Sequence, residues 1–232
     1  MITIRRSDVR GHVNHGWLDT YHAFSFASYH DPAHMGFGVL RVINEDRIAP
    51  STGFPTHGHE NMEIISYVVE GALSHKDSMG NESTIRPGEV QRMSAGTGVR
   101  HSEYNHEKNT ATHLLQIWFL PSVEGIAPSY EQKSFDSDFA QGNFVLVASE
   151  SGRDGSVTMH QDVDMYVVKS NVAGEKHYAI RRDRNIWVQV IRGEVEMEGE
   201  LLQAGDGAAI TQVLHLDLKW KANTEFLLFD LP

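Results

Sequence analysis

The chain has 232 residues, a hydrophobic content of 40%, no cysteine and a formal net charge of −11. This length and composition suffice for one large core or two small ones, and the lack of cysteine excludes disulfides, a thiolate nucleophile and sulfur ligands to a metal. The acidic balance argues against broad electrostatic contact with phosphate backbones, so we expect no direct nucleic-acid binding.

The N-terminal residues 1–6 lack the long apolar core of a signal peptide. No apolar run in the sequence approaches the ~20 residues that a bilayer span needs. We therefore expect a cytoplasmic protein that does not contact a membrane.

Four runs in the first half are rich in β-branched, aromatic and aliphatic residues, which is typical of strands: residues 39–43, 64–69, 90–93 and 113–120. Turn-forming residues such as Pro87-Gly88 separate them. The last run is apolar on both of its faces, which indicates a strand covered on both sides, as in a closed barrel with another element packed outside.

A second series of strands repeats the first. Residues 186–195 parallel residues 65–73, and residues 121–128 read as the start of a connector. We predict an all-β fold of two β-barrels with few short helices. We place the boundary near residue 133, which gives domains at residues 1–133 and 134–232.

Two pairs of residues in the first half have the spacing of metal ligands. One residue separates His57 from His59, and one separates His101 from Glu103. Side chains at i and i+2 of a strand share a face, so two such strands side by side would aim three imidazoles and one carboxylate at a single point. This set suits a divalent transition ion and leaves a coordination position for water or substrate. The sequence therefore predicts a metal site that performs chemistry.

Glu63 is the alternative carboxylate ligand. It follows His59 by an even number of residues. Parity along a strand therefore does not decide between Glu63 and Glu103.

The order of these motifs resembles the cupin superfamily: His57-Gly58-His59, Glu63, Gly71, Pro87-Gly88, Gly96-Thr97-Gly98, His101 and Asn105. Longer segments resemble the pirin family within it: residues 5–8, 15–19, 22–26, 40–46 and 93–98. The resemblance is dense from residue 1 to about 120. One departure is Gly58, where the family usually has proline, and glycine loosens that turn.

The resemblance implies two cupin barrels with a metal in the N-terminal one, held by His57, His59, His101 and Glu103. Glu63 then becomes a residue that holds a ligand imidazole through its distal nitrogen, and either glutamate is the candidate catalytic base. Iron is the expected metal, with zinc, manganese, cobalt, nickel and copper as alternatives.

The repeat predicts that the C-terminal barrel holds no metal. Counting back from Gly193 as far as His57 and His59 lie before Gly71 leads to Ala179 and Arg181. His215-Leu216-Asp217 imitates the second motif, but we expect a structural or surface role for His215.

Bacterial pirin-like proteins are associated with quercetin 2,3-dioxygenase activity, so the resemblance implies a flavonol such as quercetin and O2 as substrates. The flavonol would bind the metal, dioxygen would open its central ring, and carbon monoxide would leave. The alternative is a metal-dependent binding or regulatory protein without physiological turnover, similar to eukaryotic pirins. We expect a monomer. Apolar residues near the motifs are candidates for the wall of an aromatic pocket: Phe24, Phe26, Met35, Phe37 and Phe54.

Overall fold

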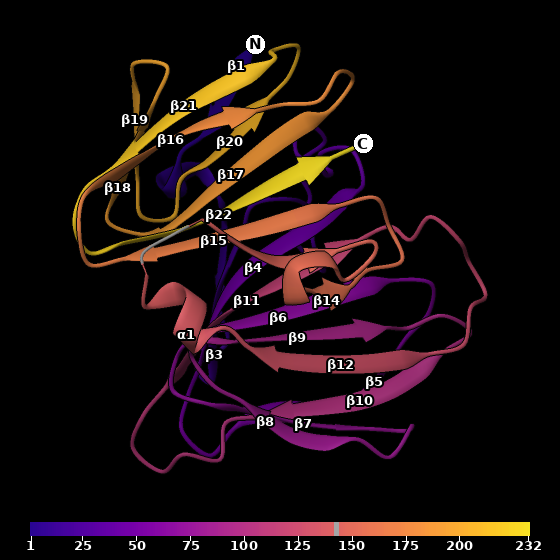
Figure 1. Ribbon diagram of the computed structural model, residues 1–232. Helices are drawn as coiled ribbons and strands as arrows, with labels where there is room; N and C mark the ends of the chain where they lie inside the picture. The colour runs from indigo at the N-terminus through magenta and orange to yellow at the C-terminus, as the bar shows by residue number, and fades with distance from the viewer. Residues whose placement is uncertain (142–143) are drawn as a thin grey trace. The chain divides into compact units, whose positions relative to one another are not determined.

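The computed structural model describes residues 1–141 and 144–232, and most elements in it are short strands (Figure 1). The chain divides into two compact units. Gly11–Phe135 with Val157–Gln161 form one, which we call the first unit. Met1–Arg10, Asp136–Ser156 and Asp162–Pro232 form the other, which we call the second unit.

This division differs from a single boundary near residue 133 at two segments. Met1–Arg10 belongs to the second unit because strand β1 (Ile2–Arg5) pairs there with β20 (Gly207–Ile210). Val157–Gln161 belongs to the first unit, where its backbone accepts a 2.8 Å hydrogen bond from Arg92 Nε at Thr158.

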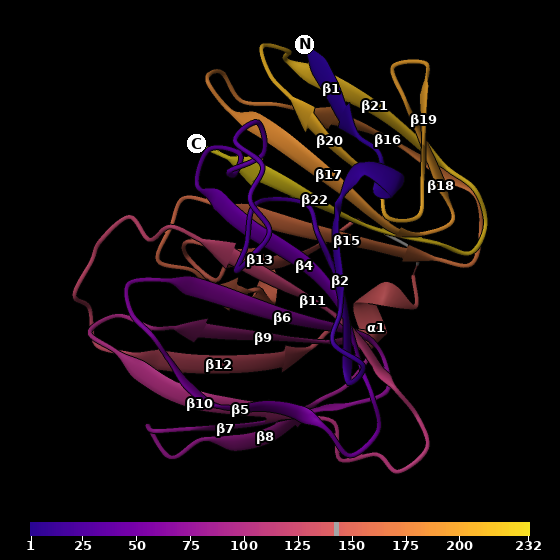
Figure 2. The same cartoon turned by 180° about the vertical axis from the view of Figure 1, so that it is seen from behind.

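The strands of the first unit are β2 (Gly11–Asn14), β3 (Leu18–His22), β4 (Leu40–Ile48), β5 (Gly53–His59), β6 (Glu63–Glu70), β7 (Leu73–Asp77), β8 (Glu82–Ile85), β9 (Glu89–Ser94), β10 (Val99–Tyr104), β11 (Thr112–Phe119) and β12 (Ser129–Ser134). They form one sheet of order β12-β9-β6-β11-β4-β3-β2 and a smaller one of order β5-β10-β7-β8 (Figure 2). These strands pair antiparallel with their neighbours.

The four strands predicted from composition are present as β4, β6, β9 and β11. β11 is buried along almost its whole length, as its two apolar faces predict. A buried cluster joins the two sheets of the first unit, with Leu114 and Val68 from the larger sheet and Leu73 and Ile85 from the smaller. The core therefore lies between the sheets and holds β5 and β10 in place.

The second unit contains β1, β13 (Val145–Ser149), β15 (Asp164–Ser170), β16 (Gly174–Ala179), β17 (Asn185–Arg192), β18 (Glu194–Met197), β19 (Glu200–Gln203), β20, β21 (His215–Trp220) and β22 (Thr224–Leu231). One of its sheets runs β1-β20-β17-β22-β15-β13, and the other runs β16-β21-β18-β19. β14 (Val157–Thr158) lies in the segment assigned to the first unit.

Helices are few and short, as predicted: α1 (Asp136–Phe139) and the 3-10 turns Ser7–Val9 and Arg153–Gly155. Among the described residues, no helix has the length and apolar content needed to cross a membrane.

The repeat inferred from the sequence is visible at matching turns. Gly71 follows β6 with φ +75° and Gly193 follows β17 with φ +74°. A Cβ atom would lie 2.8 Å from the carbonyl oxygen of Ala111 at the first position and 2.9 Å from that of Asn223 at the second. Only glycine suits both constraints. The predicted all-β fold with two related domains is therefore confirmed.

Candidate metal centre

β5 and β10 bring three histidines together. They pair antiparallel, with His57 opposite His101 and His59 opposite Val99. The Nε2 atom of His101 lies 2.9 Å from that of His59 and 3.1 Å from that of His57. The ligand nitrogens of all three residues fall within 4.8 Å of one another. The alternation of side chains along two neighbouring strands thus makes a compact cluster of imidazoles.

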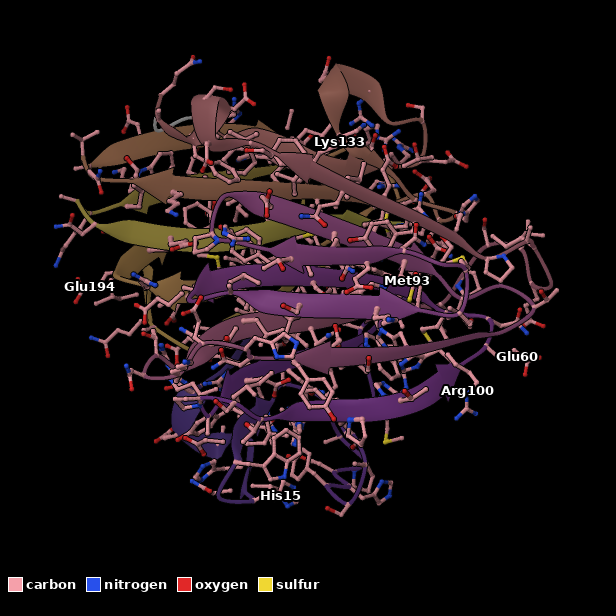
Figure 3. The ribbon with its side chains drawn as sticks, turned by 90° about the horizontal axis from the view of Figure 1, so that it is seen from below. His15, Glu60, Met93, Arg100, Lys133 and Glu194 are labelled. Carbon is pink, nitrogen blue, oxygen red and sulfur yellow. The ribbon has the colours of Figure 1, made fainter. Side chains whose placement is uncertain are left out.

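The outer neighbours of these histidines mark where the two strands reach the surface. Glu60 follows His59, and Arg100 precedes His101. Figure 3 shows Glu60 and Arg100 near one another at one edge of the molecule, and Arg100 pairs with Gly58 in the strand register. Glu60, just after β5, and Arg100, in β10, are exposed, so the surface lies next to His59 and His101.

The protonation of the cluster fits a metal ion. His57 Nδ1 lies 2.8 Å from the carbonyl oxygen of Pro55, so it donates its proton there, and Nε2 is the nitrogen that faces the cluster. Burial, reinforced by the neighbouring His57, lowers the pKa of His59 to about 4 and lowers the pKa of His101 more strongly. Neutral imidazoles with converging nitrogens suit a borderline divalent transition ion.

Glu103 lies beside this cluster and is almost completely buried. Its oxygens accept hydrogen bonds from Gln116 Nε2 at 2.7 and 2.8 Å and from Ser66 Oγ at 3.3 Å. Burial raises its pKa to about 7 although these bonds oppose the shift. Two groups of potential metal ligands are present among the described residues. Glu103 belongs to the second, with His75 and His101, and not to the group formed by the three clustered histidines. It is thus adjacent to the cluster through His101.

Glu63 occupies a different position from the one expected from the sequence. Its Oε2 atom accepts the backbone N–H of His160 at 3.0 Å and lies 3.5 Å from the ring Nδ1 of that residue. Glu63 is not among the residues that line the cavity next to the histidines. This carboxylate anchors the 157–161 segment, and its contacts are with His160 rather than with a histidine of the cluster.

A cavity of about 470 Å³ opens onto His57, His59, His101 and Glu103. Its apolar walls come mainly from Trp17, Leu18, Phe26, Phe54 and Trp118. The aromatic rings meet edge to face, with centroids 5.1 Å apart for Trp17 and Phe54 and 5.3 Å apart for Phe26 and Trp118. The site therefore combines a few polar groups with an aromatic wall, as small-molecule sites do.

The sequence identified only part of this wall. Phe26 and Phe54 line the cavity. Phe24 is buried elsewhere, Met35 is 42% exposed and Phe37 is not a lining residue. The tryptophans and Gln116 were missed. The signal that identifies Gln116 and Trp118 is their even spacing on β11, which places both on the face toward the cavity.

In the second unit, β16 and β21 carry a different set of polar residues. His177 on β16 lies 2.6 Å from Asp217 on β21, and both side chains are more than half exposed. His215 stacks on His177 with ring centroids 5.3 Å apart. This cluster lies at the surface of its sheet.

Known proteins resemble the chain over its whole length. The family model Pirin matches residues 3–119, and the model Quercetinase C-terminal cupin domain matches residues 146–231. Quercetin 2,3-dioxygenase of Escherichia coli (strain K12) is 47% identical over 232 residues, which cover 100% of this chain and 99% of that protein. A Pirin-like protein of Caulobacter vibrioides is 41% identical over 231 residues, 99% of each chain.

Solved structures give the same result. The crystal structure of YhhW from Escherichia coli has a TM-score of 0.96 and 46% sequence identity, covering 100% of this chain and 98% of that one. The structure of the bacterial pirin YhhW in complex with nickel(II) has a TM-score of 0.95 and 46% identity, covering 100% and 99%. With both halves matched by family models and full-length relatives at this identity, the chain belongs to the pirin family and carries two cupin domains.

Proposed function

We propose that this protein is a metal-dependent dioxygenase that cleaves a flavonol such as quercetin. The observation that carries the proposal is one cavity that holds three converging imidazoles, a buried carboxylate and an aromatic wall. The full-length relative named quercetin 2,3-dioxygenase supports it. In the overall reaction, one flavonol and one O2 give a ring-opened ester and one carbon monoxide.

His57, His59, His101 and Glu103 would hold one divalent metal ion. Iron is our first candidate, and the related YhhW has been crystallised with nickel(II). When bound, the ion would act as a Lewis acid that makes the 3-hydroxyl of the flavonol more acidic. The imidazoles supply neutral nitrogen donors, so the only ligand charge comes from Glu103.

Glu103 is the group that accepts the substrate proton. A carboxylate offers about four lone-pair positions, and the bonds from Gln116 and Ser66 together with a metal ion would fill them. The proton would therefore take the position of the longest of these bonds, the one from Ser66 Oγ at 3.3 Å. A base is most effective when its pKa lies near the working pH. Burial raises the pKa of Glu103 to about 7 in the protein without metal, which offsets part of the lowering that a bound cation would cause. Gln116 keeps the carboxylate oriented while the proton arrives.

The cavity favours a flat aromatic ligand. Its volume of about 470 Å³ falls in the range of about 300–1,000 Å³ that is typical of small-molecule sites. Edge-to-face tryptophan and phenylalanine rings provide flat apolar surfaces, which bind planar rings and exclude water. Exclusion of water protects an electron-rich flavonolate from reprotonation by solvent.

The proposal is tested by oxygen uptake and carbon monoxide release with quercetin, using protein of measured metal content. We expect wild type to turn over repeatedly with one O2 consumed per quercetin, His57→Ala to lose metal and uptake together, and Glu103→Gln to lose turnover at saturating metal. Glu107→Gln is the matched control, because Glu107 is exposed and does not line the cavity. If fully metallated wild type binds quercetin without turnover for each of the candidate metals, the alternative of a metal-dependent binding protein is correct.

A further inference from the structure

A buried chain of polar side chains lies behind His101. The Nδ1 atom of His101 faces His75 Nδ1 at 3.4 Å, while its Nε2 atom faces His57 and His59. On the far side, His75 Nε2 lies 3.0 Å from Asp77 Oδ2, and both of these side chains are fully buried. The strand register explains the alignment, since β7 pairs with β10 so that Asp77 lies opposite His101.

The tip of the β7–β8 hairpin fixes the Asp77 carboxylate. Its Oδ1 atom accepts the backbone N–H groups of Met79 at 2.9 Å and Asn81 at 3.0 Å, and Oδ2 accepts Asn81 Nδ2 at 2.8 Å. The tip is also tied to the ligand strand, because Ser78 N donates to the carbonyl oxygen of Arg100 at 2.8 Å and Arg100 N donates to Ser78 Oγ at 3.1 Å. Asp77 is therefore held in place as an acceptor of hydrogen bonds.

These bonds determine which nitrogen of each ring carries a proton. An ionised carboxylate only accepts, so His75 donates from Nε2 and its Nδ1 is left as an acceptor. His101 must then donate from Nδ1, which leaves the lone pair of its Nε2 pointing at His57 and His59. A metal ligand needs that tautomer, and polar partners of ligand histidines usually set it.

We infer that the His75–Asp77 pair of the β7–β8 hairpin is a positioning device of the metal centre, which fixes the tautomer and ring orientation of His101 and thereby sets metal affinity. The inference rests on the proposed role of His101 as a ligand. Neither His75 nor Asp77 touches the metal. A hairpin without a proposed ligand thus becomes part of the site.

A second metal ion among His75, His101 and Glu103 is the competing interpretation, since their ligand atoms also lie within 4.8 Å of one another. The hydrogen bonds favour the positioning role. Both nitrogens of His75 are already engaged, by His101 and by Asp77. Glu103 is held by Gln116 and Ser66. A metal at this point would have to replace several of these bonds.

Asp77→Asn tests the inference because it keeps the shape of the side chain but is expected to move the proton of His75 from Nε2 to Nδ1. The amide oxygen of the variant keeps the two backbone N–H bonds at the Oδ1 position, which places the NH2 group toward His75 Nε2. The Asn81 amide, which donates to Oδ2 in the wild type, turns over so that its oxygen accepts from this NH2 group. His75 then accepts there, carries its proton on Nδ1 and opposes the N–H of His101. Asp19→Asn is the matched control, since Asp19 lies 2.7 Å from His12 Nε2 in an exposed pair of the same unit.

The measurements are nickel titration and the ¹⁵N signals of the His101 ring in metal-free protein at neutral pH. We expect Asp77→Asn to weaken nickel binding by about 10–100-fold, Asp19→Asn to leave it unchanged, and one ion to bind per chain. Wild-type His101 should carry its proton on Nδ1, and this signal should change in Asp77→Asn. The wild-type measurement decides the question even if the variant does not fold.

A wild-type His101 protonated on Nε2 would overturn the inference, as would unchanged nickel affinity in folded Asp77→Asn, an equal loss in Asp19→Asn, or two ions per chain. None of these readouts uses quercetin. Tight nickel binding with the expected tautomer but no oxidation of quercetin would therefore refute the proposed function alone.

Discussion

Replacing Glu103 with glutamine is expected to stabilise the metal-free protein while it weakens metal binding. Burial raises the pKa of this carboxyl from 4.5 to about 7, against the opposing hydrogen bonds from Gln116 and Ser66. One pKa unit corresponds to about 1.4 kcal/mol, so the ionised side chain costs the folded state about 3 kcal/mol. Glutamine has nearly the same shape, retains an acceptor for Gln116 and carries no charge to desolvate.

The sign of the pH dependence follows from the two pKa values. The unfolded chain loses this proton near pH 4.5 and the folded chain near pH 7, so the folded state binds more protons between these values. The contribution of Glu103 to stability therefore falls as pH rises through this window. The gain in unfolding free energy of Glu103→Gln over the wild type should be near zero at pH 4 and should reach about 3 kcal/mol at pH 8.

Urea denaturation of chelator-treated protein at both pH values measures this difference. Tryptophan fluorescence reports the transition, since Trp17 and Trp118 line the cavity. Glu107→Gln serves as the exposed control and should change stability by less than about 0.5 kcal/mol. If Glu103→Gln destabilises the metal-free protein equally at pH 4 and pH 8, the hydrogen bonds of the carboxylate outweigh its desolvation and the reasoning is wrong. With metal added, the wild type should be the more stable protein, because it binds the ion more tightly than Glu103→Gln.

Three further predictions concern β5 and β10, the strands that carry the proposed metal ligands. Because the pKa of Glu103 is about 7, nickel titrations at pH 5 to 7 should show an affinity slope about one proton steeper in wild type than in Glu103→Gln; equal slopes would exclude Glu103 as a ligand. Gly53→Ala places a Cβ 2.2 Å from the Glu103 carbonyl oxygen, so we expect a loss of about 1–3 kcal/mol in urea denaturation and weaker nickel binding; normal affinity would show that this strand end does not position the site. Gly58→Ala meets only the Val99 carbonyl oxygen at 3.7 Å and should gain about 0.4–1 kcal/mol with nickel affinity retained; a destabilised variant would contradict this.

The alternation of side chains along a strand was sufficient to bring His57, His59 and His101 together, because these positions lie within the continuous strands β5 and β10. The same rule fails for Glu63. β5 ends at His59 and β6 begins at Glu63, and the turn between them contains Asn61 with φ +47°. Parity has no meaning across such a turn, so the direction of Glu63 had to come from the structure.

The sequence also did not predict which distant segments pair with one another. Proximity along the chain predicts that β1 belongs to the N-terminal domain, yet Ile2 pairs with Ile210. The even spacing of His75 and Asp77 indicates that they share a face of a strand, but not that this face meets His101. Local patterns report the period of an element, whereas its neighbours depend on tertiary packing.

The interleaved course of the chain has a consequence for its synthesis. β1 precedes all other described strands, but its partner β20 (Gly207–Ile210) follows the entire first unit. The first unit in turn needs Val157–Gln161, which supplies the backbone N–H that Glu63 accepts. On the ribosome, the first unit therefore cannot be completed until residue 161 has emerged, and β1 must stay unpaired until β20 has followed. Such non-local pairing slows folding and leaves strand edges exposed in the meantime.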